Sequence, residues 1–421
     1  MRAYCRPAYA PRLFLDKQHL KRIITMNLNS PPLTFQHIEA EFRLYSGENS
    51  LVSLTRELKR NGCQRAVVVC GRSVSRSTAM DLLRNVLGPI LVGESNTVRS
   101  NSPLSAVEET ARILGELAAD AVIAVGGGSA AVTARAASIL LAEKRPAHDL
   151  CTRRLSNGEF DSPRLIASKL PQFVVPTTPS NGFVKAGSAV HDEVTGSRLA
   201  LFDPKTRAKA LFLHPEFLRT SPSELVLSAS LNTLSTAVEA LESPKCDPIS
   251  EAMLLHSLRL IAQHVDRLSP EDIPARERLA IAAVLCGRGT EQSGGGLASV
   301  LAHAIGHRSK VANGIVNAIV LPHTMRFNAP ATLHSSQRIA EGLQIDSARG
   351  SPQQCESASA VDVLETLLGR LHIPRRLRDI GVVQDDLAHI ADAAISDWFI
   401  SRNPRRVSSA DDVQAILKDA W

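Results

Sequence analysis

Two histidines in the run "LASVLAHAIGHRSKVANGIVNAIVLPH", His303 and His307, are four residues apart. On a helix this spacing places both imidazoles on one face, which is how many proteins build a metal site. A histidine on an apolar helix can also be a hydrogen-bonded core residue, and an imidazole that titrates near neutral pH can transfer a proton. The pattern therefore leaves open a metal site, the remains of one, or a histidine-bearing core helix.

A strand, three glycines, a serine and a helix follow one another in "AVIAVGGGSAAVTARAASILLA". Gly126, Gly127 and Gly128 would let the backbone approach an anion, and the N–H groups that follow from Ser129 onward favour a phosphate at the helix N-terminus. The alternative is a tight strand-to-helix turn that needs glycine for its geometry alone.

A second strand ends in "FVVPTTPSNG", which places Thr177 and Thr178 at a strand terminus. If both strands belong to one parallel sheet, their polar ends meet at its carboxyl edge, where α/β proteins bind ligands. An ordinary proline-flanked turn is the alternative interpretation for this run.

The elements that position these residues change character along the chain. Between residues 40 and 215, apolar runs at 65–71, 89–93, 121–128 and 172–178 alternate with helical patterns at 79–88 and 106–120. Runs that are apolar on both faces predict a parallel sheet covered by helices on both sides. After residue 216 the periodicity is helical. We therefore expect an N-terminal extension (1–35), an α/β dinucleotide-binding domain (36–215) and an all-helical catalytic domain (216–421).

Composition narrows the class of protein. With 44% hydrophobic and 21% charged residues in 421, the chain suits two globular domains, and no apolar run is long enough to cross a membrane. The net charge of +6 is concentrated in residues 1–25, which hold six basic residues and one acidic residue. With 4% aromatics, nucleic-acid binding has little support. Seven cysteines without a C-x-x-C pair fit a reducing cytoplasm.

The ordered combination of GGGS, "VPTT", "AVEAL" and "AHAIGH…NGIVNAIVLPH" resembles the iron-containing alcohol dehydrogenase family, which shares its fold with the dehydroquinate synthases. The resemblance runs from about residue 40 to at least residue 330. It implies a Rossmann-like N-terminal domain, an all-α C-terminal domain and a nicotinamide cofactor in the cleft between them. A small-molecule substrate and a homodimer are the accompanying expectations.

The four positions at which family members hold their metal ion carry other residues here. In the register fixed by "AVEA" and "NGIVNAIVLPH", they are Asn232, Thr236, Ser299 and Asn313. Neutral amide and hydroxyl oxygens cannot bind a divalent ion tightly, so we expect no metal and assign these side chains to the substrate site. A shifted site on His303 and His307 is the alternative, but it has no evident third ligand.

One branch of that family, the maleylacetate reductases, works without metal. Its members resemble this chain in having Asn at the position of Asn232 and in lacking an Asp at Val132. They generally keep histidines where this chain has Thr236 and Ser299 or Asn313. The resemblance to this branch therefore concerns catalysis without a metal ion, and it does not identify the substrate.

Without an ion, another group must supply the proton and orient the substrate. His303 aligns with a family histidine that lines the site and is our candidate proton donor; His307 is the second candidate, and His323 is expected to be structural. Three basic residues could orient an acidic substrate: Lys185, which is also a candidate catalytic residue, Arg308 and its neighbour Lys310. The alternative is that they are solvated surface residues, as exposed basic residues usually are.

The first strand ends in Gly71, Arg72 and Ser73, followed by Ser75, where relatives that prefer NADH carry an acid. Loss of the acid and gain of Arg favour NADPH as the cofactor, and NADH is the alternative.

The sequence thus predicts a metal-independent NAD(P)H-dependent reductase. Its substrate would be a small carbonyl or unsaturated carbonyl compound, and an acidic compound is one interpretation. The rival is a catalytically inactive relative that binds a nucleotide or a partner, favoured by Phe183 and Val184 where relatives often have a polar pair.

Overall fold

The computed structural model describes residues 34–155, 160–309, 311–344 and 359–421. Residues 39–421 form one compact unit, which contains both the sheet and the helices of the second half. Most of the expected N-terminal extension and the basic segment 1–25 lie outside the described residues, as does Lys310. No helix in the described part of the chain is both long and apolar enough to traverse a lipid bilayer.

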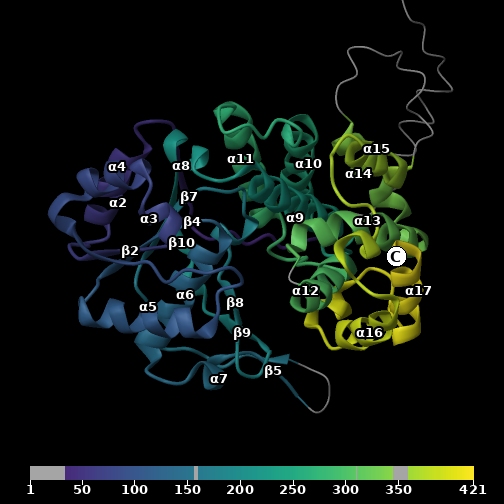
Figure 1. Ribbon diagram of the computed structural model, residues 1–421, viewed down its shortest axis with the longest axis horizontal. Coiled ribbons are helices and arrows are strands. Elements are labelled where there is room, and N and C mark those ends of the chain that lie inside the picture. Colours follow the sequence, from purple (N-terminus) through teal and green to yellow (C-terminus); the bar gives the residue numbers. More distant parts are fainter. Residues whose placement is uncertain (1–33, 156–159, 310, 345–358) are drawn as a thin grey trace, which may run out of the picture. The chain divides into compact units, whose positions relative to one another are not determined.

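A six-stranded parallel sheet forms the first half (Figure 1). Its strands are β1 (Arg43–Ser46), β2 (Ala66–Cys70), β3 (Leu91–Ser95), β4 (Ala121–Gly126), β7 (Gln172–Pro176) and β10 (Ala208–Leu213), in the order β1-β10-β7-β4-β2-β3. Every residue of β2, β4 and β7 is buried. This burial explains why their sequences are apolar on both faces.

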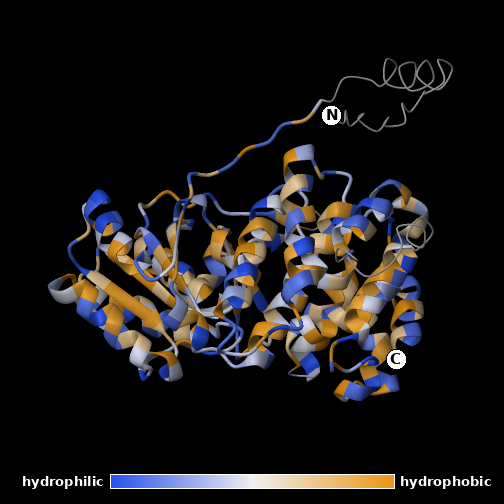
Figure 2. Ribbon diagram, turned by 90° about the horizontal axis from the view of Figure 1, so that it is seen from above, coloured by the Kyte–Doolittle hydropathy of each residue, from blue (hydrophilic) through white to orange (hydrophobic). Residues whose placement is uncertain are grey.

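Helices cover both faces of the sheet. Val67 and Val69 of β2 pack with Ala134 of α6, whereas Val68 and Cys70 pack with Leu83 of α4 on the opposite face. In Figure 2 hydrophobic residues run along the strands and recur on the helices, among hydrophilic ones. The helical elements of this half are α2 (Ser50–Arg60), α3 (Arg72–Ser75), α4 (Thr78–Leu87), η1 (Gly88–Ile90), α5 (Leu104–Glu116), α6 (Gly128–Glu143), α7 (Ala147–Leu150), η2 (Asn181–Val184) and η3 (Pro204–Thr206).

The observed elements depart from the predicted ones at the start of β3 and in short strand pairs outside the main sheet. The run 89–93 begins as the 3-10 turn η1, and its strand β3 starts at Leu91 and continues to Ser95. A hairpin of β8 (Gly187–His191) and β9 (Arg198–Phe202) was not predicted, because its strands alternate buried and exposed residues and contain no continuous apolar run. A further short pair joins β5 (Arg153–Arg154) to β6 (Phe160–Asp161).

Among the described residues after 214, every regular element is a helix. The long α9 (Ser223–Glu242) contributes many residues to the second core and packs against α10, α11 and α13. The elements are α8 (Pro215–Arg219), α9, α10 (Pro248–His264), α11 (Ile273–Gly289), α12 (Leu297–Ser309), α13 (Asn313–Asn328), η4 (Ala329–Ala331), α14 (Leu333–Leu343), α15 (Ala360–Gly369), η6 (Leu377–Ile380), η7 (Gln384–Asp386), α16 (Leu387–Ile395), η8 (Trp398–Arg402) and α17 (Ala410–Ala420). The predicted fold class, a Rossmann-like α/β half followed by an all-α half, is confirmed.

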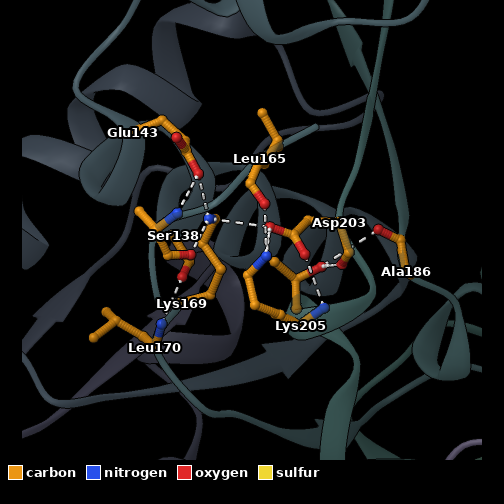
Figure 3. Close-up of polar contacts among 10 residues, drawn as sticks. Ser138, Glu143, Leu165, Lys169, Leu170, Ala186, Asp203 and Lys205 are labelled. Atoms are coloured by element: carbon orange, nitrogen blue, oxygen red, sulfur yellow. Dashed lines mark hydrogen bonds and ion pairs between the residues drawn. The ribbon is translucent and has the colours of Figure 1, made fainter. Parts of the chain in front are cut away.

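A buried ion-pair network fixes the start of β7 (Figure 3). Lys169 has a fully buried side chain, and its Nζ lies 2.6 Å from Oε1 of Glu143 at the end of α6 and 3.0 Å from Oδ2 of Asp203. The Oγ of Ser138 accepts the N–H of Leu170 at 3.0 Å. A buried cation with two carboxylate partners holds α6, β7 and the segment after β9 in one register. This register in turn places the opposite end of β7 beside the glycine loop.

Candidate active site

The glycine loop joins β4 to α6. Gly126 adopts φ +144°, a conformation that favours glycine, and Gly127 precedes the first helical residue, Gly128. A Cβ added to Gly128 would lie 2.7 Å from Oγ of Ser180, and one added to Gly127 would lie 3.0 Å from Oγ1 of Thr178. The loop therefore needs small residues because the segment after β7 passes close to it.

The two polar strand ends meet as neighbours at the carboxyl edge of the sheet. The N–H of Thr177 donates to the carbonyl of Gly126 at 2.9 Å, and both Thr177 and Thr178 are buried. The carbonyl of Ser129 accepts a hydrogen bond from Ser102 at 3.1 Å, which ties the first turn of α6 to a neighbouring loop. That first turn contains no acidic residue. The arrangement fits a dinucleotide pyrophosphate.

One of the polar residues that follow β2 is already hydrogen-bonded within the protein. Gly71 has an extended backbone and precedes α3, and the side chains of Arg72 and Ser73 are exposed. Ser75 instead donates to Glu94 at 3.2 Å, within a network in which Nε of Arg84 lies 2.7 Å from the same carboxylate. Only Arg72 and Ser73 therefore remain as open candidates for a ribose phosphate at this strand end.

The segment after β7 connects the glycine loop to α9, which carries Asn232 and Thr236. Ser180 adjoins Gly128, and the carbonyl of the preceding Pro179 accepts a hydrogen bond from Oγ1 of Thr233 at 3.3 Å. The glycine loop of the first half and the central helix of the second half thus meet through two residues. Asn232 and Thr236 remain partly exposed on that helix.

Three of the four positions that differ from the family pattern use their polar side chains internally. Oγ of Ser299 donates to Oε2 of Glu239 at 2.5 Å. Oδ1 of Asn232 accepts from Asn317 at 3.0 Å, and Oγ1 of Thr236 donates to the carbonyl of Asn232 at 2.8 Å. The fourth residue, Asn313, is exposed at the start of α13, with its side chain against Gly306.

Both halves of the chain match family models. Residues 42–215 match the model "Iron-containing alcohol dehydrogenase", and residues 226–421 match "Fe-containing alcohol dehydrogenase family, C-terminal". The chain belongs to the iron-containing alcohol dehydrogenase family. Members of this family are NAD-dependent alcohol dehydrogenases and reductases, so the chain is placed in a family of NAD-dependent oxidoreductases.

Individual relatives match over most of their length at low identity. Lactaldehyde reductase from Escherichia coli K12 is 26% identical over 392 residues, covering 89% of this chain and 97% of the relative. Maleylacetate reductase 1 from Cupriavidus pinatubonensis is 24% identical and covers 90% and 95%. The structure of sulfoacetaldehyde reductase from Bifidobacterium kashiwanohense, in complex with NAD⁺, has a TM-score of 0.80 at 17% identity and covers 92% of this chain and 99% of its own. That structural match supports the fold alone.

The side chains at the iron-containing alcohol dehydrogenase ligand positions do not fit a divalent metal ion. They offer neutral oxygens, and those of Ser299 and Asn232 already take part in hydrogen bonds with Glu239 and Asn317. Within the part of the chain that the structure describes, no group of three or more His, Cys, Asp or Glu side chains is arranged to hold an ion. The side chain of His307 lies outside the described residues.

His303 forms a side-chain hydrogen bond with Asp397 that the sequence did not reveal. Its Nδ1 lies 2.9 Å from Oδ2 of Asp397, its ring is tilted over Phe399 at a centroid distance of 6.0 Å, and its side chain is 17% exposed. Burial, together with the nearby charge of Arg198, lowers the pKa of His303 to about 4, against the opposing effect of Asp397. The ring is therefore neutral at pH 7, below which it takes up a proton only near its lowered pKa, and its role as proton donor stays a prediction.

Two buried carboxyl groups on α9 were also missed. Glu239 and Glu242 are 5% and 7% exposed. Burial raises the pKa of Glu239 to about 7 and that of Glu242 to about 8, although hydrogen bonds from Ser299 and Asn328 act in the opposite direction. The motif "AVEALE" gave no signal for this, because glutamates on a helix are usually solvated.

The positively charged candidates are paired with carboxylates. Nζ of Lys185 lies 3.6 Å from Glu291, which also pairs with Arg207, and burial lowers the pKa of Lys185. Arg308, with 46% of its side chain exposed, donates to Asp386 at 2.6 Å. These partners compensate both charges, so the predicted roles of Lys185 and Arg308 gain no support from the geometry. His323 lies on α13, and burial lowers its pKa.

Proposed function

We propose that this chain is a metal-independent, NAD(P)H-dependent oxidoreductase that reduces a small carbonyl or unsaturated carbonyl compound. When bound, the nicotinamide exchanges a hydride with the substrate carbon. The observation that carries the proposal is the hydrogen bonding at the family's ligand positions, where Ser299, Asn232 and Thr236 bond to protein groups. These bonds engage the side-chain oxygens that would otherwise face an ion.

The glycine loop supports the cofactor part of the proposal. It adjoins α9 through Ser180 and Pro179, so a nucleotide on α6 would extend toward the side chains of Asn232 and Thr236. The exposed Arg72 beside Gly71, together with the absence of an acid at this strand end, supports NADPH over NADH. The ratio of kcat/KM for the two cofactors tests this preference, and a strong preference for NADH would contradict it.

A second candidate function is a nucleotide-binding relative without turnover. It is favoured by the segment after the threonine pair, in which Phe183 and Val184 are 2% and 8% exposed and pack against α11. An apolar pair buried in this way contacts the helical half and leaves no polar group there for a substrate.

Fluorescence titration with NADPH, followed by turnover assays, separates these functions. Protein stripped of metal is titrated and then assayed with a panel of aldehydes and 4-oxo-enoic acids. Binding with turnover supports the oxidoreductase, and acidic substrates that react faster than neutral analogues would support the acidic substrate class. Binding without turnover on any substrate favours the second candidate, and absence of binding contradicts both.

The homodimer and the cytoplasmic location stay predictions. Sedimentation of the purified chain tests the first, since a monomer at micromolar concentration would contradict it. Fractionation of cells that express the full chain tests the second.

A further inference from the structure

The contact between His303 and Asp397 joins two elements distant in sequence. His303 lies on α12, and Asp397 immediately precedes η8, where its Oδ1 also accepts the N–H of Phe399 at 2.9 Å. The two oxygens of one carboxylate are therefore divided between the backbone and the imidazole. This division fixes the direction from which Oδ2 meets the ring.

The charge state of Asp397 determines where the hydrogen lies. Burial raises the pKa of Asp397, but the hydrogen bond with His303 and the charge of Arg198 outweigh burial, so its pKa lies below the usual value. An ionised carboxylate has no hydrogen to give, so Nδ1 of His303 must carry the hydrogen of this bond. In a neutral ring, Nε2 is then the unprotonated nitrogen.

Arg198 on β9, in the first half of the chain, places a positive charge near this pair. Its positive charge lowers the pKa of both His303 and Asp397. It therefore favours an ionised Asp397 beside a neutral His303. In this state the ring carries one proton, on Nδ1, and Nε2 carries none.

We propose that Asp397 is a positioning residue that holds His303 with Nδ1 protonated and Nε2 free to exchange a proton with the substrate oxygen. The inference rests on the proposed oxidoreductase function. In the direction of alcohol oxidation, the substrate carbon loses a hydride with its electron pair to the oxidised nicotinamide. The O–H bond breaks, its electron pair completes the C=O bond, and the proton passes to Nε2. In reduction, the same nitrogen must first be protonated and then returns that proton to the oxygen.

The tautomer is tested on the wild-type protein by ¹⁵N NMR with labelled histidine. The signals of His303 are assigned by their loss in His303→Gln. At neutral pH we expect a protonated Nδ1 and an unprotonated Nε2. An Nε2-protonated ring would overturn the proposal, and this measurement does not depend on turnover.

The kinetic test uses Asp397→Asn, because asparagine keeps the ability to accept the Phe399 N–H at the start of η8. We expect kcat for alcohol oxidation to fall about tenfold to a hundredfold while the KM for the cofactor stays within about twofold. The NMR signals should show loss of the single tautomer. The matched control, Asp392→Asn on the exposed surface of α16, should leave rate and tautomer unchanged.

A double substitution distinguishes positioning from general loss of stability. In a His303→Gln background, Asp397→Asn should change kcat less than about twofold, because its effect acts through the imidazole. A wild-type rate in Asp397→Asn, or an equal loss with and without His303, would overturn the proposal. Absence of NADPH binding or turnover in the wild type would instead contradict the proposed function.

Discussion

Ser299 and Glu239 form a paired contact between α12 and α9. The hydroxyl of Ser299 donates to Oε2 across 2.5 Å, and its backbone N–H donates to Oε1 across 2.8 Å. Glu239 is 5% exposed, so these donors replace the water that its carboxyl group loses on folding. Ser299 stands at a position where the family pattern has a metal ligand. Here the side chain at that position bonds to a carboxyl group of the protein.

Ser299→Ala should destabilise the protein by about 1–2 kcal/mol, because the buried carboxyl loses one of its donors and keeps the backbone one. Urea unfolding at neutral pH measures the difference. Ser336→Ala on α14 is the control for the loss of a serine hydroxyl elsewhere. A Ser299→Ala variant as stable as the wild type would show that the hydroxyl contributes nothing to holding Glu239.

The free energy of unfolding should fall as pH rises from about 4.5 to about 8. The pKa values of Glu239 and Glu242 lie above their ordinary value in the folded state, at about 7 and about 8. Over this range the unfolded chain releases the protons of both carboxyl groups while the folded chain retains them. A rise in pH therefore favours the unfolded state. Glu239→Gln should reduce this decline and be more stable than the wild type at about pH 8.5, with a smaller difference at about pH 4.5. Equal pH slopes in the two proteins, measured by urea unfolding, would contradict the raised pKa of Glu239.

The rates of oxidation and reduction should depend on pH in opposite ways through His303. Its pKa is lowered to about 4, so the unprotonated base needed for oxidation is lost only as pH falls through that value. Reduction needs the protonated ring, so its rate should fall as pH rises above that pKa. Profiles of kcat/KM in both directions check this, and His303→Gln should remove both dependences. An apparent pKa near 7 that disappears with His303 would contradict the neutral ring.

Gly128→Ala should weaken NADPH binding by about tenfold or more, because the new Cβ would lie 2.7 Å from Oγ of Ser180 and would place a methyl group at the N-terminus of α6, where a phosphate would approach the backbone. Fluorescence titration gives the dissociation constant. Gly187→Ala is the matched control, since its added Cβ meets no atom within 4 Å and its backbone is not left-handed. Equal affinities in the two variants would argue against a phosphate at this loop.

The sequence predicted the features that depend on local patterns. Continuous apolar runs identified β2, β4 and β7, and consecutive glycines marked the turn into α6, because burial on both faces and close backbone approach leave direct signatures. The β8–β9 hairpin was missed because its short strands alternate in burial. Asp397 and Glu239 were missed for a different reason. Each acts through a partner, His303 or Ser299, that is 94 or 60 residues away, and no spacing rule connects such pairs.

The central claim is turnover without a metal ion, and one measurement tests it directly. The purified protein is analysed for bound iron and zinc, and its NADPH-dependent rate on a reactive carbonyl substrate is measured before and after exhaustive chelation. We predict metal far below one ion per chain and an unchanged rate, because Ser299, Asn232 and Thr236 bond to protein groups. A rate that chelation abolishes and added Fe²⁺ or Zn²⁺ restores would contradict the account.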